Sequence, residues 1–449
     1  MKMKPAVDLV YNIKDKPPVG VVILSAIQQL LAIMVATIAV PAAVGNGMTA
    51  SAALFGAGVG TIVYLLFTKN ASPVFLGSSF AFIGPMLTAF AGAASMAVGY
   101  AGLIIGAVVA GLIYVIIALV VRFCGVGWIS KLMPPVIIGP VVACIGLSLS
   151  GYAVSLLTSP SIEGGSTNIC LLCGLITLAV AMVCATYGNK NVKLIPFMIG
   201  IIAGYAVASV LYLIGRKTGT DNLCVISYAP FAEVKSFIAF PEFSFLKADW
   251  SGVTGGYLLT LFVAYAPVAF VVFAEHLADH KNLSVIIGKD LLEEPGLYRT
   301  LLGDGIGSVF GTVFGGCPNT TYGESIACVA ITGNASTVSI WGAAIAAILF
   351  SMVTPLVAFL ESIPSCVMGG VCIGLYGFIA SSGFKMFQKV DLNDNCNLFT
   401  ACVIFIIGVG NMTVHFGSVE IRTTACALIL GILTNVMLSR KKPEQPAEE

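Results

Sequence analysis

The sequence predicts an all-α polytopic membrane protein with fourteen transmembrane segments in two inverted repeats of seven. Three observations support this fold class. Of the 449 residues, 58% are hydrophobic and only 10% are charged, with a mean hydropathy of +1.00, whereas about a quarter of a soluble domain is charged. Apolar runs long enough to approach the thickness of a bilayer recur along the whole chain. Two pairs of similar motifs also link its first half to its second.

Charged or turn-forming residues bound the apolar runs. The predicted spans are 20–43, 51–68, 74–94, 97–121, 134–155, 168–187, 194–214, 254–278, 301–316, 318–333, 337–360, 364–383, 397–413 and 421–439. The third and tenth contain proline, glycine and small polar residues, so they predict broken segments and not smooth helices.

The distribution of lysine and arginine predicts the orientation, because cytoplasmic loops accumulate these residues. With the N-terminus inside, seventeen of the 22 basic residues fall on the cytoplasmic side. The five outside are Arg216, Lys217, Lys235, Lys247 and Arg422. A missed span would scramble this bias. We therefore expect a multi-pass protein of the inner (plasma) membrane with both termini cytoplasmic and no cleavable signal peptide.

Internal similarity predicts the repeats. Phe55–Thr61 (FGAGVGT) resembles Leu302–Ser308 (LGDGIGS), about 245 residues later, and Pro134–Val141 (PPVIIGPV) resembles Pro364–Val371 (PSCVMGGV), 230 residues later. Short matches between glycine-rich helices also arise by chance, but two collinear matches count against chance. Seven spans per half place the copies in opposite orientations. Inverted repeats are typical of secondary transporters, whose substrates bind near the midplane where broken helices meet.

Acidic residues inside the spans are the first candidates for function. Of the 21 acidic residues, only Glu275, Asp304 and Glu324 lie well inside apolar segments, and Asp279 lies at the end of one. Such residues are costly in a membrane and usually mark substrate or proton pathways. A low dielectric favours the protonated form of a carboxylate, as a proton-coupled carrier requires. Glu275 and Asp279 are four residues apart and share a helical face.

Each of these residues also has a structural alternative. Glu275 could pair with the adjacent His276 or bond a neighbouring span. For Asp279, His276 and His280, which lie nearer the cytoplasmic edge, the alternative is likewise a structural role in pairing or in bonding to a neighbouring span. Asp304, between two glycines, could equally cap a helix or bond the backbone of the tenth span.

The two broken spans share one design. Gly316–Ser325 (GCPNTTYGES) and Pro73–Phe80 (PVFLGSSF) each place a proline and a glycine around a short extended piece before a helical run. The two half-helices would then point their N-termini, with unpaired N–H groups and positive dipole ends, at one central place. Phe80 and Tyr322 either line a flat ligand there or belong to the packed core.

Other kinds of chemistry have little support in the sequence. The thirteen cysteines lie mostly in apolar runs, where a thiol packs as a small hydrophobe. Cys170 and Cys173 form a CxxC with no second pair or nearby histidine, so we expect packing and not a metal site. No phosphate-binding loop occurs, which argues against ATP-driven transport. The net charge of +1 gives no reason to expect a nucleic-acid partner.

A membrane-embedded enzyme would need a nucleophile, a metal cluster or an acid–base pair. The one nearby candidate pair is Glu275 and His276, which are adjacent on a helix and point about 100° apart. We therefore expect no enzymatic activity, no metal and no cofactor, with the proton as the coupling ion.

Three motifs together resemble the nucleobase-ascorbate transporter family, also called nucleobase:cation symporters, and most closely its bacterial uracil:proton permeases. These motifs are PNTTYGES at 318–325, EHLADH at 275–280 and GSSFAFIGP at 77–85. The resemblance extends over essentially the whole chain. It implies a core domain of spans 1–4 and 8–11, a gate domain of spans 5–7 and 12–14, and short antiparallel strands in spans 3 and 10 that meet at the substrate.

The implied division follows the span boundaries. It comprises a cytoplasmic N-terminus (1–19), the core domain (20–121 and 254–360), the gate domain (134–214 and 364–439), an extracellular loop (215–253) and a cytoplasmic tail (440–449).

The resemblance also implies the site residues. In the uracil permeases two glutamates bind the pyrimidine, and they match Glu275 and Glu324 here. Backbone amides of the family site match Phe80 and Gly323. Further lining positions match Ala36, Tyr322 and Tyr376.

Proton coupling is expected from Glu275, Asp279 and Asp304, although the chain departs from the family pattern. Gln28-Gln29 stands where the family often has Gln-His. Asp279 replaces a histidine of the uracil permeases and, with Asp304, resembles the purine-carrying branch. Glu324, where purine carriers tend to have glutamine, favours uracil.

Two carboxylates without a cation suit a flat, neutral ligand with N–H donors, because charged acceptors make strong hydrogen bonds. Uracil fits this description, and an anion such as sulfate or bicarbonate does not. We therefore expect uracil import by proton symport, with lipid around the protein and room for a homodimer. The alternatives are a xanthine-type purine symporter, an anion carrier of the same fold, a membrane-embedded enzyme and a channel.

Overall fold

The computed structural model describes residues 7–125, 128, 134–162, 164–388, 390–416 and 419–439. Residues 1–6 of the expected N-terminal segment and the whole expected tail, 440–449, lie outside the described residues. So do several basic residues of the orientation count, namely Lys2, Lys4, Lys131, Lys389, Arg440, Lys441 and Lys442.

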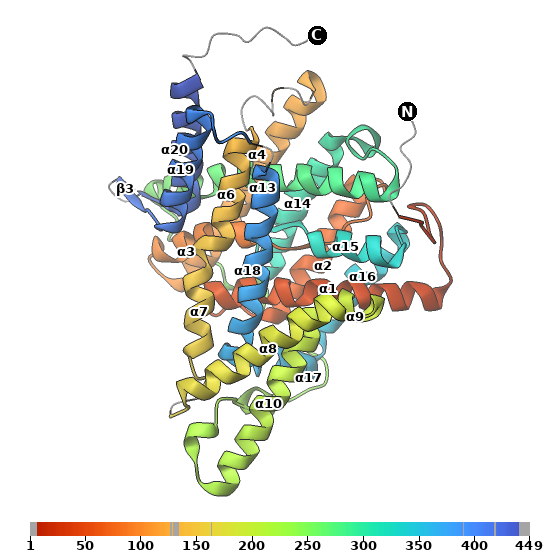
Figure 1. Ribbon diagram of the computed structural model, residues 1–449, viewed down its shortest axis with the longest axis vertical. Helices are drawn as coiled ribbons and strands as arrows, with labels where there is room; N and C mark the ends of the chain where they lie inside the picture. Colours follow the sequence, from red (N-terminus) through yellow and green to blue (C-terminus); the bar gives the residue numbers. More distant parts are fainter. Residues whose placement is uncertain are drawn as a thin grey trace.

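Helices make up most of the described chain (Figure 1). The long helices and their partners are α1 (Val19–Val44), α2 (Ala50–Phe67), α3 (Ile83–Ala91), α4 (Met96–Cys124), α6 (Pro135–Ser148), α7 (Ser150–Thr158), α8 (Thr167–Tyr187), α9 (Lys190–Leu194), α10 (Pro196–Thr218), α13 (Gly255–Ile287), α14 (Leu297–Gly315), α15 (Gly323–Thr332), α16 (Thr337–Met352), α17 (Thr354–Glu361), α18 (Ser365–Phe387), α19 (Asn395–Val409) and α20 (Thr423–Ser439). Short turns of helix are η1 (Phe80–Phe82), η2 (Asp221–Leu223), α11 (Ala229–Ala232), α12 (Ser244–Lys247) and η3 (Leu292–Gly296).

Each predicted span coincides with a helix, a pair of helices or a strand followed by a helix. Among the described residues, eight helical segments are long and apolar enough to cross a membrane, judged by length and composition. Shorter apolar helices coincide with five more of the predicted spans. The ninth, 301–316, lies in α14, a helix of 19 residues. The membrane protein class is confirmed, and the count of fourteen crossings stays a prediction.

The two broken spans meet in a two-stranded sheet. Strand β1 (Leu76–Ser78) precedes η1 and α3, and strand β2 (Asn319–Thr321) precedes α15. The strands are antiparallel, with Leu76 opposite Thr321 and Ser78 opposite Asn319. The predicted short strands are therefore confirmed. Because the strands run in opposite directions, the helices that follow them leave in opposite directions, and both N-termini lie beside the sheet.

The repeated glycine motifs bring α2 and α14 together and hold β2 in place. The Asn319 side chain lies between the two helices and donates from Nδ2 to the Gly56 carbonyl at 3.1 Å. Ser308 Oγ donates to the Asn319 carbonyl at 2.6 Å. A Cβ atom on Gly60 or Gly311 would collide with the Asn319 amide. The repeated glycine motifs therefore lie where α2 and α14 cross closely, and this crossing leaves room for the Asn319 side chain.

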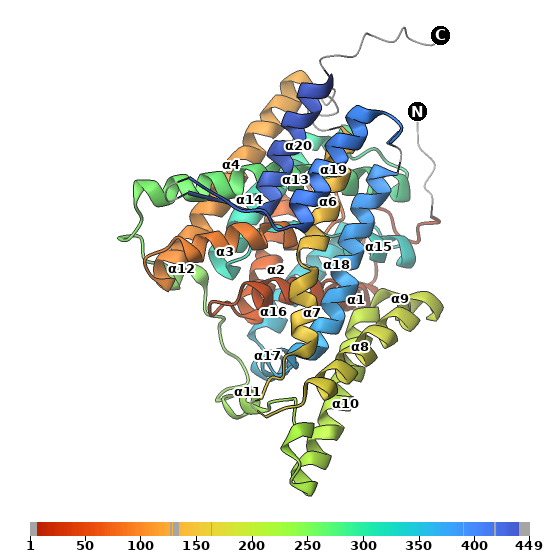
Figure 2. The ribbon, with the colours of Figure 1, turned by 60° about the vertical axis from the view of Figure 1, so that its left-hand side comes forward.

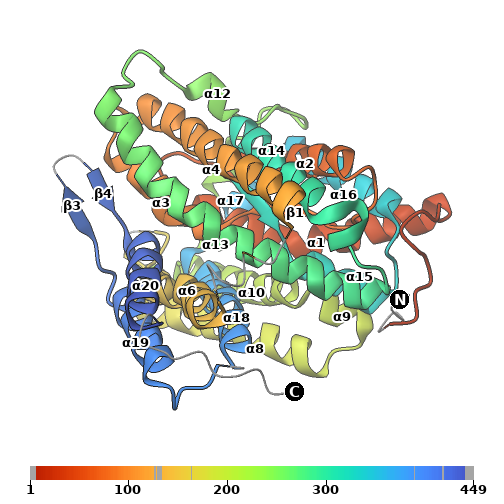
Figure 3. The ribbon, with the colours of Figure 1, turned by 90° about the horizontal axis from the view of Figure 1, so that it is seen from above.

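The helices form two packed groups, which Figure 3 shows side by side. The first group contains α1, α2, α4, α13, α14 and α16, and the second contains α6, α7, α8, α10, α18, α19 and α20. Helix α13 of the first group also contacts α6 and α20 of the second. The first group comes from the residues expected for the core domain and the second from those expected for the gate domain. That they move against each other remains a proposal.

Two features differ from the predicted elements. Helix α13 continues to Ile287, nine residues beyond the predicted end of the eighth span, so Asp279 lies within a helix and not at its end. A hairpin of β3 (Val414–Phe416) and β4 (Val419–Ile421) connects α19 to α20, where no strands were expected. The end of α10 lies at the opposite end of the molecule from the end of α20 (Figures 1 and 2).

Candidate functional site

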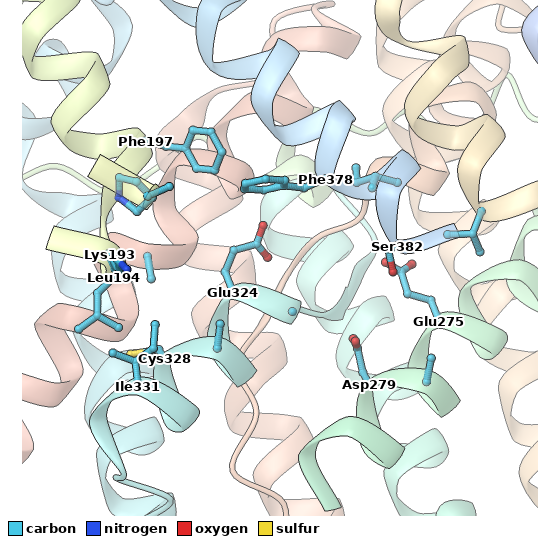
Figure 4. A pocket seen from close by; sticks show the side chains of 18 of the residues that line it. Lys193, Leu194, Phe197, Glu275, Asp279, Glu324, Cys328, Ile331, Phe378 and Ser382 are labelled. Carbon is cyan, nitrogen blue, oxygen red and sulfur yellow. The ribbon is translucent and has the colours of Figure 1, made fainter. Parts of the chain in front are cut away.

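A large cavity of about 400 Å³ lies between the two helix groups. Helices α13 and α15 form one wall, and α18 with the α9–α10 connection forms the other. Its charged lining residues are Glu275, Asp279, Glu324 and Lys193 (Figure 4). Three of the four acidic residues singled out from the sequence therefore share one cavity.

Helix α13 presents two different faces through residues four apart. Glu275 and Asp279 line the cavity and are partly exposed to it. His276 and His280 are fully buried on the other side of the helix. The helical periodicity thus separates a carboxylate face from a histidine face.

Glu324 lies in the first turn of α15, and Figure 4 shows its carboxylate between Lys193 and the two α13 carboxylates. The first intrahelical bond of α15 runs from the Ile326 N–H to the Tyr322 carbonyl at 3.2 Å. Among the described residues, no side chain caps this end of the helix. The N–H groups before Ile326 therefore lack an intrahelical partner, and the positive end of the helix dipole favours a negative group beside it.

Gly323 opens the backbone of this turn to the cavity. A Cβ atom built on Gly323 would meet no other atom within 4 Å. The residue is exposed and lines the large cavity. A ligand can therefore approach the backbone amide at this position without displacing a side chain.

A second, smaller cavity of about 50 Å³ continues from the first. Both are lined by Glu275, Gly323, Glu324 and Ile379. Ser79, Phe80 and residues 320–322 are among the other residues that line the smaller one. The ends of both strands and both expected substrate-binding glutamates therefore meet at one point of the fold.

Two aromatic candidates, Phe80 and Tyr322, line this smaller cavity, and the third, Tyr376, contacts Phe80. The Tyr322 hydroxyl donates to the Ser78 carbonyl at 2.6 Å, which ties the end of β2 to β1. The Phe80 ring contacts the Tyr376 ring edge-on, with the centroids 5.6 Å apart. Tyr376 belongs to α18, so this contact joins the two helix groups. Tyr376 itself is buried beside the cavities and does not line the described ones.

Ala36 is buried in α1 and likewise does not line the described cavities. Ala32, one helical turn earlier, lines the large cavity. The role of Ala36 in substrate binding stays a prediction.

Asp279 and Asp304 have different surroundings. Asp279 Oδ2 accepts a hydrogen bond of 2.7 Å from Thr321 Oγ1 in β2. Asp304 is buried in α14, where its Oδ2 lies 2.7 Å from His276 Nδ1. His276 Nε2 lies 3.0 Å from Thr300 Oγ1. The histidine considered as a partner of Glu275 therefore pairs with Asp304, which does not line the described cavities.

Lys193 was not predicted as a site residue. It is the one basic side chain among the described residues that line the large cavity. Sequence reasoning placed it in a cytoplasmic loop because it lies just before the seventh span. The helix α9 that carries it has only five residues and gives no periodic signal. No group of three or more His, Cys, Asp or Glu side chains placed to hold a metal occurs in the part of the chain that the structure describes.

The fold and the carboxylate-lined cavity between two helix groups define a polytopic membrane permease. A family model described as a permease family matches residues 20–417, and the chain belongs to this family.

The uracil permease of Bacillus subtilis (strain 168) is 38% identical over 443 residues, which cover 97% of this chain and 96% of that protein. The uracil permease of Escherichia coli (strain K12) is 34% identical over 440 residues, which cover 97% of this chain and 96% of that protein. The family expected from the three motifs is therefore confirmed.

Solved structures share the fold at low sequence identity. The transmembrane domain of a cyanobacterium bicarbonate transporter, BicA, aligns with a TM-score of 0.62 and 16% identity, covering 92% of this chain and 96% of that chain. SLC26A9 aligns with a TM-score of 0.60 and 14% identity, covering 93% of this chain and 64% of that chain. These similarities establish the fold alone.

Proposed function

We propose that this protein imports uracil by proton symport. The observation that carries the proposal is that Glu275 and Glu324, from distant parts of the chain, face one cavity beside the open N-terminus of α15. The carboxylates would accept hydrogen bonds from the ring N–H groups. Backbone N–H groups at Gly323 and Phe80 would donate to the ring carbonyls. The names of the relatives at 38% and 34% identity support uracil as the substrate.

The arrangement of the acidic residues supports coupling to protons. Three carboxylates share the large cavity, and like charges in one site favour the uptake of a proton by at least one of them. We assign this proton to Glu275 or Asp279, which lie four residues apart on α13. Asp304 would act through His276, because it contacts that ring and not the cavity. No cofactor or metal is needed for this mechanism.

Transport would follow from movement of the core domain (20–121 and 254–360) against the gate domain (134–214 and 364–439). The large cavity lies between elements of both. Lys193 and Met386 line it at helix ends expected on the cytoplasmic side, so we assign this conformation to the inward-open state. Cytoplasmic termini, a homodimer and the absence of enzymatic activity complete the proposal.

A xanthine-type purine is the second candidate substrate. Asp279 and Asp304 resemble the purine-carrying branch, and a cavity of about 400 Å³ also leaves room for a bicyclic base. An anion is disfavoured, although a bicarbonate transporter shares the fold. Three carboxylates against one lysine would repel it.

The test combines binding and transport. Purified protein should gain thermal stability with uracil, less with xanthine and none with bicarbonate. In proteoliposomes, uptake of labelled uracil should rise with an inward proton gradient and fall when a protonophore collapses it. Thermal stabilisation by xanthine but not by uracil would contradict the assignment of uracil as the substrate. Uptake that ignores the proton gradient would contradict the coupling and leave the substrate assignment standing.

A further inference from the structure

Two arginines share one aromatic ring at the end of α4 and the start of α14, which lie side by side (Figure 3). The Arg122 guanidinium carbon lies 5.4 Å from the centroid of the Tyr298 ring. The Arg299 guanidinium carbon lies 5.4 Å from the same centroid. Arg299 Nε also donates to the Tyr298 hydroxyl at 2.7 Å. Two positive charges are therefore held around a single side chain.

No acidic side chain neutralises this pair within the described part of the chain. The ion pairs found there are Lys247–Glu242, His276–Asp304 and Lys289–Glu294. Glu294, the carboxylate four residues before Tyr298, is thus engaged by Lys289 at 3.1 Å. Two guanidinium groups without a counter-charge repel each other, and an anion between them removes that repulsion. The geometry therefore favours a bound anion.

The donors at this point suit a phosphate. A guanidinium presents a planar fork of N–H groups that matches two oxygens of one phosphate. Arg122 is exposed, and Arg299 and Tyr298 are partly exposed, so all three are accessible. The Tyr298 oxygen accepts from Arg299, which leaves its own proton to donate. Two guanidinium groups and one hydroxyl are thus available to an anion that binds beside this ring.

The surface that leads to this pair is apolar and faces outward. Along α4, the exposed apolar side chains include Val108, Leu112, Ile116, Leu119 and Phe123. Their spacing of three and four residues places them on one face of the helix. Phe123, which is 80% exposed, ends the row beside Arg122. In a membrane protein such a face contacts acyl chains, and the arginines lie where the headgroup of the same lipid would be.

We propose that Arg122, Arg299 and Tyr298 form a binding site for the phosphate of an anionic phospholipid in the leaflet expected to be cytoplasmic. The acyl chains lie along the exposed face of α4. Clusters of basic residues next to membrane helices are attracted to anionic lipids. The site is on the surface of the first helix group, away from the cavity that holds the carboxylates.

The experiment uses delipidated full-length protein in detergent and measures thermal unfolding. Phosphatidylglycerol should raise the melting temperature, whereas phosphatidylcholine with the same acyl chains, and glycerol 3-phosphate at the same concentration, should not. The double variant Arg122→Gln/Arg299→Gln should need roughly tenfold more phosphatidylglycerol for the same shift, since each lost bond is charge-assisted. Native mass spectrometry should show fewer retained phosphatidylglycerol molecules on this variant.

Matched variants separate the site from general charge. Lys190→Gln removes an exposed positive charge from α9 and should respond to phosphatidylglycerol as the unmodified protein does. Tyr298→Phe keeps the ring but not the hydroxyl, so it should lose only part of the stabilisation by phosphatidylglycerol. Arg122→Lys keeps the charge but not the planar guanidinium, so its stabilisation should lie between those of the unmodified protein and the double variant. If glycerol 3-phosphate raised the melting temperature as much as phosphatidylglycerol does, the site would bind a soluble phosphate and not a lipid, and the proposal would be overturned. An unchanged response of the double variant would overturn it as well.

Discussion

Glu324 combines the two properties expected of a substrate-binding carboxylate in a membrane. Its place in the first turn of α15 gives it the support of the helix dipole, and the neighbouring Gly323 leaves the backbone beside it open. Glu275 reaches the same cavity from α13, almost fifty residues earlier in the chain. Both residues could be recognised as candidates from the sequence because their neighbours are apolar.

We predict that Glu324→Gln weakens uracil binding by roughly tenfold to a hundredfold. A neutral amide replaces a charged acceptor, and hydrogen bonds to charged groups contribute about 1.5–3 kcal/mol. Ligand-dependent thermal stabilisation measures the change. Glu233→Gln, an exposed position in the loop after α10, is the control and should bind normally. Full affinity of Glu324→Gln would remove this residue from the site.

Thr321 is expected to hold Asp279 in place, since its hydroxyl donates to the carboxylate at 2.7 Å. Thr321→Val keeps the branched shape that suits a strand but removes the donor. We predict that the affinity for uracil changes by at most about fourfold, which corresponds to the loss of one weak hydrogen bond. The dependence of uracil uptake on the proton gradient should change much more than the affinity.

Uptake measured at several external pH values tests this role of Thr321. Thr312→Val is the control, because that hydroxyl donates only to the Ser308 carbonyl of its own helix. If both variants keep the pH profile of the unmodified protein, Asp279 does not depend on Thr321.

At the scale of elements, the crossing of α2 and α14 determines where the binding residues lie. Gly60 and Gly311 leave space for the Asn319 side chain, and Asn319 begins the strand that leads to Tyr322 and Glu324. Gly60 belongs to the first repeated motif and Gly311 follows the second by three residues. This crossing therefore affects the site although neither glycine lines the described cavities.

We predict that Gly60→Ala destabilises the protein by about 1–3 kcal/mol, because the added methyl group collides with Asn319 and overpacks the crossing. Thermal unfolding measures the loss. The matched control is Gly151→Ala in α7, where a Cβ atom meets nothing within 4 Å and the change should be neutral or slightly stabilising. Equal shifts for the two variants would show that the crossing is less tight than the structure indicates.

At the scale of the whole molecule, the cavity between the two helix groups implies a conformation open to one side. Ser382 of α18 lines this cavity and is exposed to it. A substrate held between α13, α15 and α18 would cover it.

We therefore predict that a cysteine introduced as Ser382→Cys reacts with a membrane-impermeant thiol reagent from the cytoplasmic side, and that uracil slows the reaction. Peptide mass spectrometry follows this one position, so the thirteen native cysteines do not interfere. Thr423→Cys, at the start of α20 in a separate cavity lined also by α3, α6 and α13, should show the opposite sidedness, because this end of α20 is expected outside. Reaction of Ser382→Cys from the outside alone would reverse the assigned orientation.

The sequence alone determined the class, the family and most of the element boundaries. Many long apolar runs in one chain predict membrane-spanning segments. A carboxylate inside such a segment costs enough free energy that its presence alone indicates a functional role. The glycines and prolines of the two broken spans also marked the strands and the half-helices in advance.

Only the tertiary structure decided which polar groups meet. The pairing of His276 with Asp304, the arrival of Lys193 in the cavity and the bond from Thr321 to Asp279 all join segments that are distant in sequence. No local pattern encodes such a contact, because it depends on how the helices cross. For the same reason the hairpin before α20 and the shared ring of Arg122 and Arg299 became visible only once the chain was folded.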